Sequence, residues 1–268
     1  MIDIHCHVLP GVDDGIKQVE DAVAFCRIAR ADGIRVLVAT PHMKEGFHVN
    51  ELAAIRVKVG ELQARLESEE VDLRLEVGSE VYFCADLLQG IRERRLATLA
   101  DGNRYLLLEL PYDQHPVKVE ETVFALKIGG ITPIFAHPER VRYFQDDLDR
   151  LERVVRQGAL SQLTATALTG GFGSKVEGLS LEMVRRGLVH FLASDAHDLK
   201  HRPPVLSAAR ERLASLAGEE VARAAVEGHP RAVLEGRPVE PAWLLERLDD
   251  SSRPSAFGRM LRRMRPGR

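Results

Sequence analysis

The sequence has 268 residues, 45% of them hydrophobic, and a net charge of −3, so it is long enough to bury the core of one large domain or two small ones. Its three cysteines, Cys6, Cys26 and Cys84, show no paired spacing, which excludes a disulfide framework and a cysteine-based zinc site. No apolar run approaches the roughly 18 residues of a membrane-spanning helix, and no secretory signal pattern is present, so we expect a cytoplasmic protein.

Seven apolar segments with strand character recur along the chain. They are residues 1–8, 34–42, 73–80, 105–111, 131–139, 159–168 and 188–197. Segments with helical character separate them; at 19–29 and 52–66, apolar residues recur at spacings of three and four. Strands that alternate with amphipathic helices predict a parallel sheet. Seven such units without a Gly/Ser-rich interruption predict one closed or nearly closed α/β barrel.

The first strand, in the segment MIDIHCHVLPGVDDG, carries unusually polar residues for a buried element. Simple alternation places Ile2, Ile4, Cys6 and Val8 on one face, toward the helices, and Asp3, His5 and His7 on the other. Both histidines then point into the mouth of the barrel. Two satisfied core histidines are the alternative, but adjacent buried imidazoles are costly without a ligand.

Other ionisable residues stand at the C-terminal ends of the later apolar segments. They are His42, Glu80, Glu109, His137, Asp195 and His197. Barrel enzymes build their active sites at this end of the strands, so we expect these side chains to converge. Together with the two histidines and an aspartate of the opening segment they make nine nitrogen and oxygen donors. This set suits two or three ions of Mn²⁺, Zn²⁺ or Fe²⁺, which favours phosphoester hydrolysis.

Six segments together resemble the PHP (polymerase and histidinol phosphatase) superfamily. They are DIHCHVLPGVDDG, TPHMKEGF, VGSEVYF, LLLELP, FAHPERVRY and SDAHDLKHRPP, in order over residues 1 to about 235. Within the superfamily they resemble the manganese-dependent bacterial protein-tyrosine phosphatases of capsule or exopolysaccharide synthesis. The resemblance implies a distorted (β/α)7 TIM-like barrel of the PHP type over residues 1–248, with its active site at the C-terminal ends of the strands.

The resemblance also implies three metal ions, with manganese expected and iron or zinc as alternatives. The implied ligands are His5, His7, Glu80 and Asp195 for the first ion, Glu80, Glu109 and His137 for the second, and Asp14, His42 and His197 for the third. Arg140 and Arg202 match the family's phosphate-contacting arginines, with a surface salt bridge as the alternative for each. Asp13 is expected to shape the turn or support a ligand instead of binding metal.

The expected activity is hydrolysis of phosphotyrosine by a metal-activated hydroxide. No cysteine is followed by the x5-Arg of the phosphate-binding loop that cysteine-dependent tyrosine phosphatases use. The family implies a bacterial tyrosine kinase, through its phosphotyrosine-rich C-terminal tail, as the partner. The alternatives are a histidinol phosphatase or other PHP phosphoesterase acting on a small alkyl phosphate, and a non-catalytic, metal-bound scaffold.

The C-terminal region differs from the rest of the chain in charge. Residues 251–268 hold six arginines and no acidic residue, which leaves a net charge of −9 on the remainder. We therefore expect no nucleic-acid binding by the body. Residues 249–268 are predicted to form a flexible basic tail that touches an acidic partner or a membrane surface, or is simply solvated. Trp243 is expected to dock a terminal segment on the barrel.

The sequence also predicts where the five remaining histidines and two aromatic residues lie. Surface or loop positions are expected for His48, His115, His190, His201 and His229. Tyr112 and Phe83 stand beside ligand positions, where they either line an aromatic entrance for the substrate ring or pack in the core.

Overall fold

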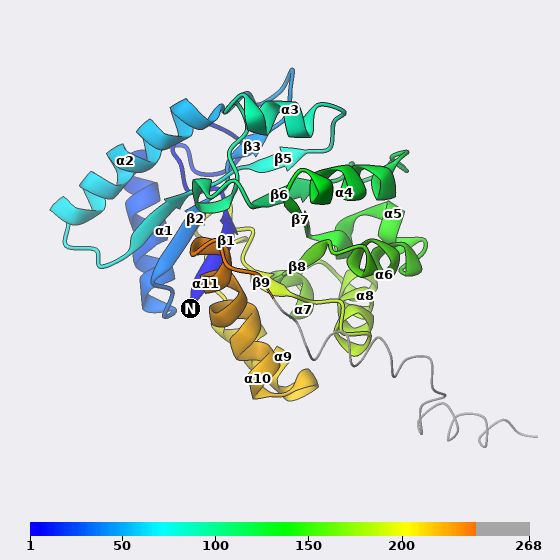
Figure 1. Ribbon diagram of the computed structural model, residues 1–268. Coiled ribbons are helices and arrows are strands. Elements are labelled where there is room, and N and C mark those ends of the chain that lie inside the picture. The colour runs from blue at the N-terminus through cyan, green and yellow to red at the C-terminus, as the bar shows by residue number, and fades with distance from the viewer. Residues whose placement is uncertain (240–268) are drawn as a thin grey trace, which may run out of the picture.

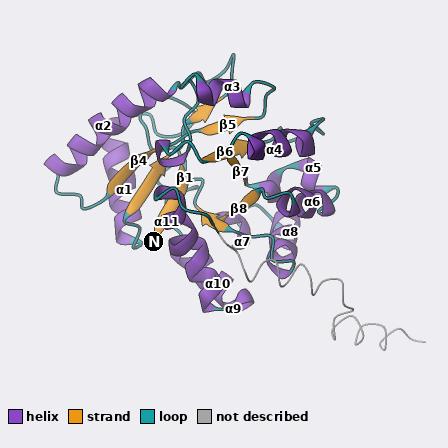
Figure 2. Cartoon of the chain, viewed as in Figure 1, coloured by secondary structure: helices purple, strands orange, loops and turns teal. Residues whose placement is uncertain are grey.

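Parallel strands occupy the middle of the molecule and helices surround them (Figures 1 and 2). The computed structural model describes residues 1–239. The predictions for Trp243 and for the basic tail of residues 249–268 lie outside this part of the chain.

The strands form two sheets, with the orders β1-β2-β4 and β3-β5-β6-β7-β8-β9. Neighbouring strands within each sheet are parallel. Their bounds are β1 (Ile2–Cys6), β2 (Val36–Ala39), β3 (His42–Met43), β4 (Arg74–Val77), β5 (Glu80–Tyr82), β6 (Tyr105–Glu109), β7 (Thr132–Ala136), β8 (Leu160–Thr164) and β9 (Phe191–Ala193). A parallel bridge between Cys6 and Ala196 joins the end of β1 to the segment after β9. This contact closes the ring.

The α-helices are α1 (Val19–Ala31), α2 (Leu52–Ser68), α3 (Leu87–Arg92), α4 (Val119–Ile128), α5 (Arg142–Gln145), α6 (Asp149–Arg156), α7 (Ala165–Leu168), α8 (Ser174–Arg185), α9 (Ser207–Ala217), α10 (Glu219–Arg223) and α11 (His229–Leu234). Short 3-10 turns lie at Leu99–Asp101 (η1) and Pro138–Arg140 (η2), and a π-helical turn lies at Ala224–Gly228 (η3). Both helices predicted from apolar spacing, α1 and α2, are present.

Two of the seven predicted strands are each broken into two short ones. Residues 34–42 form β2 and β3, and residues 73–80 fall in β4 and β5. Pro41, at the first break, has no N–H to continue the ladder. Gly78, at the second, lies so close to β2 that a Cβ there would come within 2.7 Å of Val38 Cγ1. Because β3 follows β2 and β5 follows β4, the strands still make seven positions, as the predicted (β/α)7 barrel requires.

A β-bulge in β1 makes the predicted simple alternation of its side chains wrong. Asp3 pairs with Leu37 and Cys6 with Ala39, so β1 holds one extra residue between these two pairs. Ile2 and Ile4 therefore belong to the apolar cluster inside the barrel, while Cys6 packs with the helix layer.

The bulge still directs His5 of β1 and His7, the residue after the strand, into the barrel mouth. Asp3 supports it, because its Oδ1 accepts hydrogen bonds from the backbone N–H of His5 at 3.2 Å and of Ser194 at 3.1 Å. The Asp3 carboxylate thereby stabilises the backbone around the bulge. It belongs to none of the donor groups at the barrel mouth.

Strand β8 is shorter than predicted. It ends at Thr164, and the following residues Ala165–Leu168 form α7 instead of continuing the strand. The sequence ATAL combines two alanines and a leucine, which favour a helix. The backbone N–H of Thr164 leaves the ladder and donates to Oε1 of the buried Glu139 at 3.1 Å.

The interior of the barrel is apolar below the mouth. Its buried residues are Ile2, Ile4, Val38, Leu99, Tyr105, Leu107, Ile134, Ala136, Leu160, Phe191, Ala193 and Val233. A larger apolar cluster fills the layer between the strands and the helices. Rigid packing on both sides of the strands fixes the positions of the side chains at their C-terminal ends.

His190 and His229 are both buried; the surface-or-loop prediction is wrong for His229, the first residue of α11, whereas His190 does stand in a loop. His190 Nδ1 accepts the backbone N–H of Ser161 at 3.2 Å, and His229 Nδ1 donates to the carbonyl oxygen of His190 at 2.7 Å. Apolar periodicity could not reveal this pair, because the partners are backbone groups of distant segments. His115 and His201 are exposed, as predicted.

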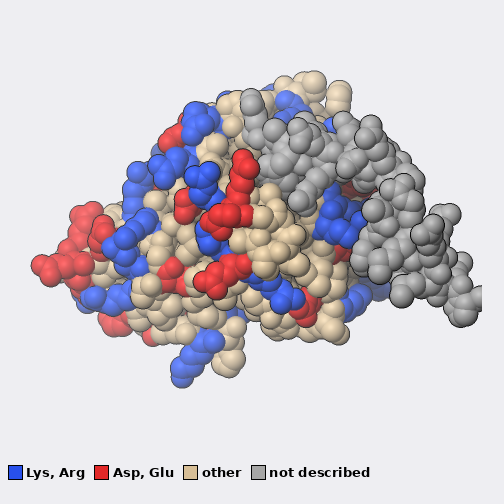
Figure 3. Space-filling model, turned by 90° about the horizontal axis from the view of Figure 1, so that it is seen from below, with Lys and Arg blue, Asp and Glu red and all other residues tan. Residues whose placement is uncertain are grey.

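The surface mixes both signs of charge. Figure 3 shows lysine and arginine side chains interspersed with acidic ones over the face that it displays. The described residues on this face offer no extended positive stripe of the kind that a phosphate backbone requires. None of the helices within residues 1–239 has the length and hydropathy needed to cross a bilayer.

Candidate metal centre

The nine residues predicted to bind metal meet at the C-terminal end of the barrel. Their donor atoms form four groups, in each of which all the atoms lie within 4.8 Å of one another. The groups are His7, Asp14, His42 and His197; His5, His7 and Glu80; His5, His137 and Asp195; and His42, Glu80 and Glu109. Because the groups share members, they make one continuous cluster.

Two histidine nitrogens in the buried part of the cluster lie at ligand spacing from each other and from two carboxylate oxygens. The Nε2 atoms of His5 and His7 are 3.2 Å apart, and each lies 3.3–3.5 Å from Glu80 Oε2 and Asp195 Oδ1. Metal–ligand bonds of about 2.0–2.2 Å separate neighbouring ligands by about 3.0–3.5 Å. The residues present therefore fit a divalent cation, and all four are buried.

Glu80 lies at the centre of the cluster. Its Oε2 is 2.9 Å from His42 Nδ1, and its Oε1 is 2.7 Å from His137 Nε2. One carboxylate thus faces three sets of donors, which is the arrangement of a bridging ligand. Glu109 Oε2 lies 3.6 Å from His42 Nδ1. In the structure Glu109 therefore groups with His42, whereas the resemblance implied that it shares an ion with His137.

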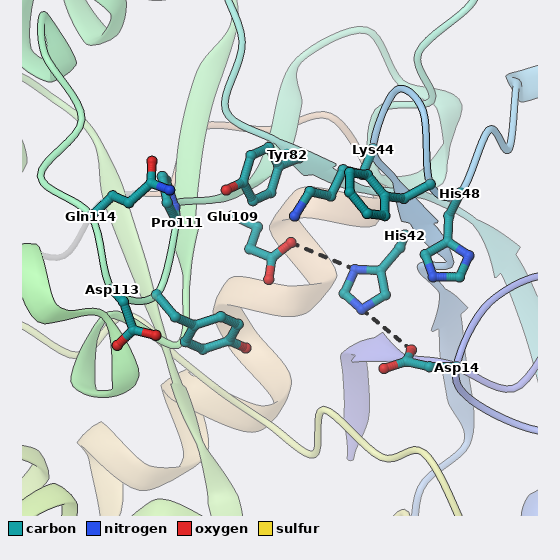
Figure 4. A pocket seen from close by; sticks show the side chains of 11 residues that line it. Asp14, His42, Lys44, His48, Tyr82, Glu109, Pro111, Asp113 and Gln114 are labelled. Atoms are coloured by element: carbon teal, nitrogen blue, oxygen red, sulfur yellow. Dashed lines mark ion pairs between the residues drawn. The ribbon is translucent and has the colours of Figure 1, made fainter.

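The outer part of the cluster is open to solvent. Asp14 Oδ1 lies 3.4 Å from the Nε2 atoms of both His42 and His197, and 58% of the Asp14 side chain is exposed. Figure 4 shows His42 between Asp14 and Glu109, facing the cavity. An ion held here would be in contact with both water and substrate.

Buried acceptors orient His5 and His7. His5 Nδ1 lies 2.8 Å from Gln162 Oε1, and His7 Nδ1 lies 2.7 Å from Asp13 Oδ2. A proton on each Nδ1 leaves the Nε2 lone pair directed at the cluster. The structure agrees with the expectation that Asp13 supports a ligand. Gln162 was missed by the sequence analysis, although a polar residue inside the apolar segment 159–168 was a usable signal.

The carboxylates of the cluster differ in their affinity for protons. Burial opposes ionisation of Glu80 and Asp195, but neighbouring histidines outweigh it and hold both pKa values well below the usual range. Burial, together with the charge of Glu80, raises the pKa of Glu109 to about 8. The cluster therefore keeps anionic donors at its centre at neutral pH.

Both predicted phosphate-binding arginines reach the cluster. Arg140 Nη1 and Arg202 Nη2 each donate to Asp195 Oδ2 at 2.5 Å, so neither forms the surface salt bridge considered as the alternative. The ring of Phe172 lies below them, 4.6 Å from the Arg140 guanidinium carbon and 6.0 Å from that of Arg202. Phe172 was not predicted as a site residue, although its glycine-rich segment LTGGFG follows a predicted strand.

Comparison with known proteins identifies the family. A family model described as capsular polysaccharide synthesis, CpsB/CapC, matches residues 1–235. The tyrosine-protein phosphatase YwqE of Bacillus subtilis is 40% identical over 202 residues, which cover 75% of this chain and 79% of YwqE. The putative tyrosine-protein phosphatase CapC of Staphylococcus aureus is 36% identical over 206 residues, covering 77% and 80% of the two chains. The chain belongs to the CpsB/CapC family.

The fold agrees with this assignment. A solved structure from work on YwqE of Bacillus subtilis and CpsB of Streptococcus pneumoniae, described as unique metal-dependent tyrosine phosphatases, superposes with a TM-score of 0.86 at 35% identity. It covers 90% of this chain and 96% of the matched one. The predicted fold, the metal-dependent tyrosine-protein phosphatase class and the link to capsular polysaccharide synthesis are thereby confirmed.

A cavity of about 330 Å³ leads to the metal centre of this CpsB/CapC protein. Tyr112 lines it and stacks on His137, with ring centroids 5.3 Å apart and planes 11° apart. Figure 4 shows Tyr82, Lys44 and Glu109 around the same space. Phe83 instead packs against the apolar core. Of the two aromatic residues considered from the sequence, Tyr112 lines the entrance and Phe83 does not.

Two residues of the CpsB/CapC site have a left-handed backbone. The φ angle is 33° at His137 and 50° at Asp195, a conformation that residues other than glycine seldom adopt. The backbone N–H of Asp195 donates to the carbonyl oxygen of His5 at 2.9 Å, which anchors this conformation against β1. Such backbone strain concentrates at functional sites, where surrounding contacts maintain it.

Proposed function

We propose that this chain hydrolyses the phosphate ester of phosphotyrosine in a protein, with two or three divalent metal ions held by the nine clustered side chains. The observation that carries the proposal is the spacing of the His5 and His7 Nε2 atoms, which lie 3.2 Å from each other and 3.3–3.5 Å from the Glu80 and Asp195 carboxylate oxygens inside the barrel mouth. The similarity to the structure from work on YwqE and CpsB, described as metal-dependent tyrosine phosphatases, supports it.

The donor set determines which metals suit the site. Histidine nitrogens and carboxylate oxygens, without thiolates, suit manganese, iron or zinc, and we propose manganese as the native ion. Bound ions supply a nucleophile from water near neutral pH and offset the charge of the phosphoryl group. The protein contributes the positions of these ions, through imidazoles whose Nδ1 atoms are fixed by Gln162 and Asp13.

The two arginines are placed to bind the phosphate. Arg140 and Arg202 both donate to one oxygen of Asp195, so their guanidinium groups already converge. Guanidinium groups bind phosphate oxygens through paired hydrogen bonds and stabilise charge that develops during phosphoryl transfer. The ring of Phe172 packs beside both guanidinium groups next to Asp195.

The walls of the cavity favour an aryl ester. Tyr112 and Tyr82 line the space above the metal centre, where a phenyl ring can stack or pack edge to face. A phenolate leaving group has a pKa of about 10, so its departure needs little help from a general acid. The alkoxide that leaves from an alkyl phosphate is far more basic, so its departure needs more help. Both points favour phosphotyrosine over histidinol phosphate or phosphoserine.

For the physiological substrate we propose the phosphotyrosine-bearing C-terminal tail of a bacterial tyrosine kinase that serves capsule or exopolysaccharide synthesis, in the cytoplasm. Membership in a family of capsular polysaccharide synthesis supports this choice. We propose residues 1–248 as the catalytic barrel and the arginine-rich residues 249–268 as a contact for an acidic partner or membrane surface. Truncation after Asp250 tests the proposed role of the arginine-rich residues. We expect the truncated protein to lose its association with the acidic partner or membrane surface.

Hydrolysis assays test the activity. Phosphotyrosine peptide, phosphoserine peptide and histidinol phosphate are compared with added Mn²⁺, Fe²⁺ or Zn²⁺ and with a chelator. We expect the phosphotyrosine peptide to have a kcat/KM about 100-fold above the other two with Mn²⁺, and no turnover in chelator. Equal turnover of histidinol phosphate would favour the small-substrate alternative, and metal binding without any turnover would favour the scaffold.

Metal content tests the assignment of the ligands. Glu80→Gln removes one negative charge and one ligand oxygen from the centre of the cluster, so we expect the purified protein to lose at least one bound ion of the two or three. Elemental analysis measures this ratio. Glu61→Gln, at an exposed carboxylate on α2, is the matched control and should retain the wild-type content. Unchanged metal content in Glu80→Gln would contradict the bridging role.

A further inference from the structure

A second cavity adjoins the one above the metal centre. It has a volume of about 730 Å³, within the range of cavities that hold small ligands. Lys44, Phe47 and Tyr82 line both cavities, so the two spaces meet at these three side chains. Figure 4 shows Lys44 and Tyr82 next to Glu109 and His42 of the metal centre. The second cavity plays no part in the mechanism described above.

A structured turn presents apolar side chains at the boundary. The backbone N–H of Lys44 donates to the carbonyl oxygen of His48 at 2.8 Å, and the backbone N–H of His48 donates to the carbonyl oxygen of Lys44 at 2.9 Å. Gly46 supplies the positive φ of 79° that the turn requires. Phe47 and Val49 are nevertheless 76% and 59% exposed. Large apolar side chains held in water beside an active site mark a contact surface.

Lys44 is held at the passage between the two cavities. Its Nζ lies 3.9 Å from the centre of the Tyr82 ring and 4.9 Å from that of Phe47. Within residues 1–239 these ring contacts, not a carboxylate, position the ammonium group. Its N–H groups can still donate to a peptide carbonyl that crosses the passage.

The second cavity combines an apolar floor with a charged rim. Met43, Val81 and Leu96 are buried beneath it, and each is at most 9% exposed. Charged side chains of both signs stand at the edge: the carboxylates are those of Glu45, Glu51 and Asp86, and the cationic groups those of Lys44 and Arg95. An apolar side chain gains burial in this space, whereas an acidic one loses solvation over the apolar floor.

We propose that the second cavity binds the apolar side chain of a residue that flanks the phosphotyrosine in the substrate protein. This inference rests on the proposed function. A peptide whose phosphotyrosine fills the first cavity must continue over its edge, and the shared side chains Lys44, Phe47 and Tyr82 lead directly into the second. The enzyme then selects its substrates by the sequence around the phosphotyrosine as well as by the phosphoryl group.

Matched phosphopeptides test the proposal. Two series carry leucine, serine or aspartate beside the phosphotyrosine, one on its N-terminal and one on its C-terminal side. In one series we expect kcat/KM for leucine to exceed that for serine by about tenfold and that for aspartate by more. Val49→Asp should bring the leucine-to-serine ratio close to one. The ratio is insensitive to a general loss of activity.

Phe124→Asp is the matched control, because Phe124 is 65% exposed on α4 and lines neither cavity. It should keep the wild-type ratio. Equal kcat/KM for leucine and serine in both series of the wild-type enzyme would overturn the inference while leaving the proposed function intact. Failure to hydrolyse any phosphotyrosine peptide would overturn the proposed function, and this inference with it.

Cys84 provides an independent measurement, since it is exposed and lines the second cavity, while Cys6 and Cys26 are buried. A leucine-flanked peptide with a non-hydrolysable phosphonate in place of the phosphate should slow alkylation of Cys84 by N-ethylmaleimide severalfold. The serine-flanked phosphonate, at equal occupancy of the metal centre, should protect less. Equal protection by the two peptides, or none, would contradict the proposal. Mass spectrometry of the labelled peptide gives the rate.

Discussion

Nδ1 of His7 lies 2.7 Å from Oδ2 of Asp13, in a contact from which solvent is excluded. The same carboxylate accepts the backbone N–H of Gly15 at 3.0 Å and that of His42 at 3.1 Å. Burial alone would raise the pKa of Asp13, but His7 and these amides outweigh it and lower the pKa to about 2. One carboxylate therefore fixes a ligand and two backbone segments of the metal centre.

We expect Asp13→Ala to weaken metal binding by about 10- to 100-fold, because removing a residue that orients a ligand has effects of this size. Competition with a chromophoric chelator measures the affinity. Glu20→Ala, at an exposed carboxylate near the start of α1, is the control. An unchanged affinity in Asp13→Ala would show that His7 needs no such support.

Gly15 allows the opening loop to approach His7. A Cβ at position 15 would come 2.3 Å from the carbonyl oxygen of His7 and 2.4 Å from its Cβ, and neither atom can move without displacing β1. We expect Gly15→Ala to lower the free energy of unfolding by about 2 kcal/mol. Gly60→Ala, in the middle of α2 with open space around it, should instead add about 0.5–1 kcal/mol. Urea unfolding of the metal-free proteins distinguishes these outcomes, and equal effects would refute the steric argument.

Much of this site follows from the sequence because barrel topology converts order along the chain into proximity. Glu80 and His137 are far apart in the sequence, but each stands beside the C-terminal end of a strand position, and their side chains lie 2.7 Å apart. Apolar segments with intervening amphipathic helices were sufficient to predict this arrangement.

The remaining features depend on contacts that periodicity does not encode. The bulge in β1 arises from register against β2 and reverses the expected positions of Ile2 and Ile4. Phe172 acquires its role only because its ring, in the loop after α7, lies within 4.6 Å of the Arg140 guanidinium carbon and 6.0 Å of that of Arg202. His190 is buried because the backbone N–H of Ser161 on β8 donates to its Nδ1, and the side chain of His229 on α11 donates to its carbonyl oxygen. In each case the decisive partner is distant in the sequence.

The arginines provide a test of phosphate binding. Arg140→Ala and Arg202→Ala should each lower kcat/KM for a phosphotyrosine peptide by about 100- to 1000-fold, because each removes a charged donor from the developing phosphoryl charge. The metal content should stay at the wild-type level, since neither guanidinium is a metal ligand. Arg142→Ala, whose exposed side chain pairs with Asp146 on α5, is the control and should keep full activity. A loss of bound metal in the two site variants would assign the arginines a structural role instead.

The buried His190 makes the stability of the fold dependent on pH. Burial lowers its pKa to about 3, from 6.5 in an exposed histidine. Above pH 6.5 both the folded and the unfolded chain hold this imidazole neutral, so it has no effect on stability. As the pH falls toward 3, only the unfolded chain takes up the proton, and the free energy of unfolding declines by about 2 kcal/mol at pH 5 from this group alone.

His190→Gln should remove that part of the decline, because its amide oxygen can accept the N–H of Ser161 but takes up no proton. We expect the loss of stability between pH 7.5 and pH 5 to be smaller in this variant than in the wild type by about 2 kcal/mol. Urea unfolding in the presence of chelator measures the difference without a contribution from bound metal. His201→Gln removes a histidine whose side chain is 90% exposed and should leave the pH dependence unaltered. If His190→Gln declines as steeply as the wild type, protonation of His190 does not contribute to the acid sensitivity.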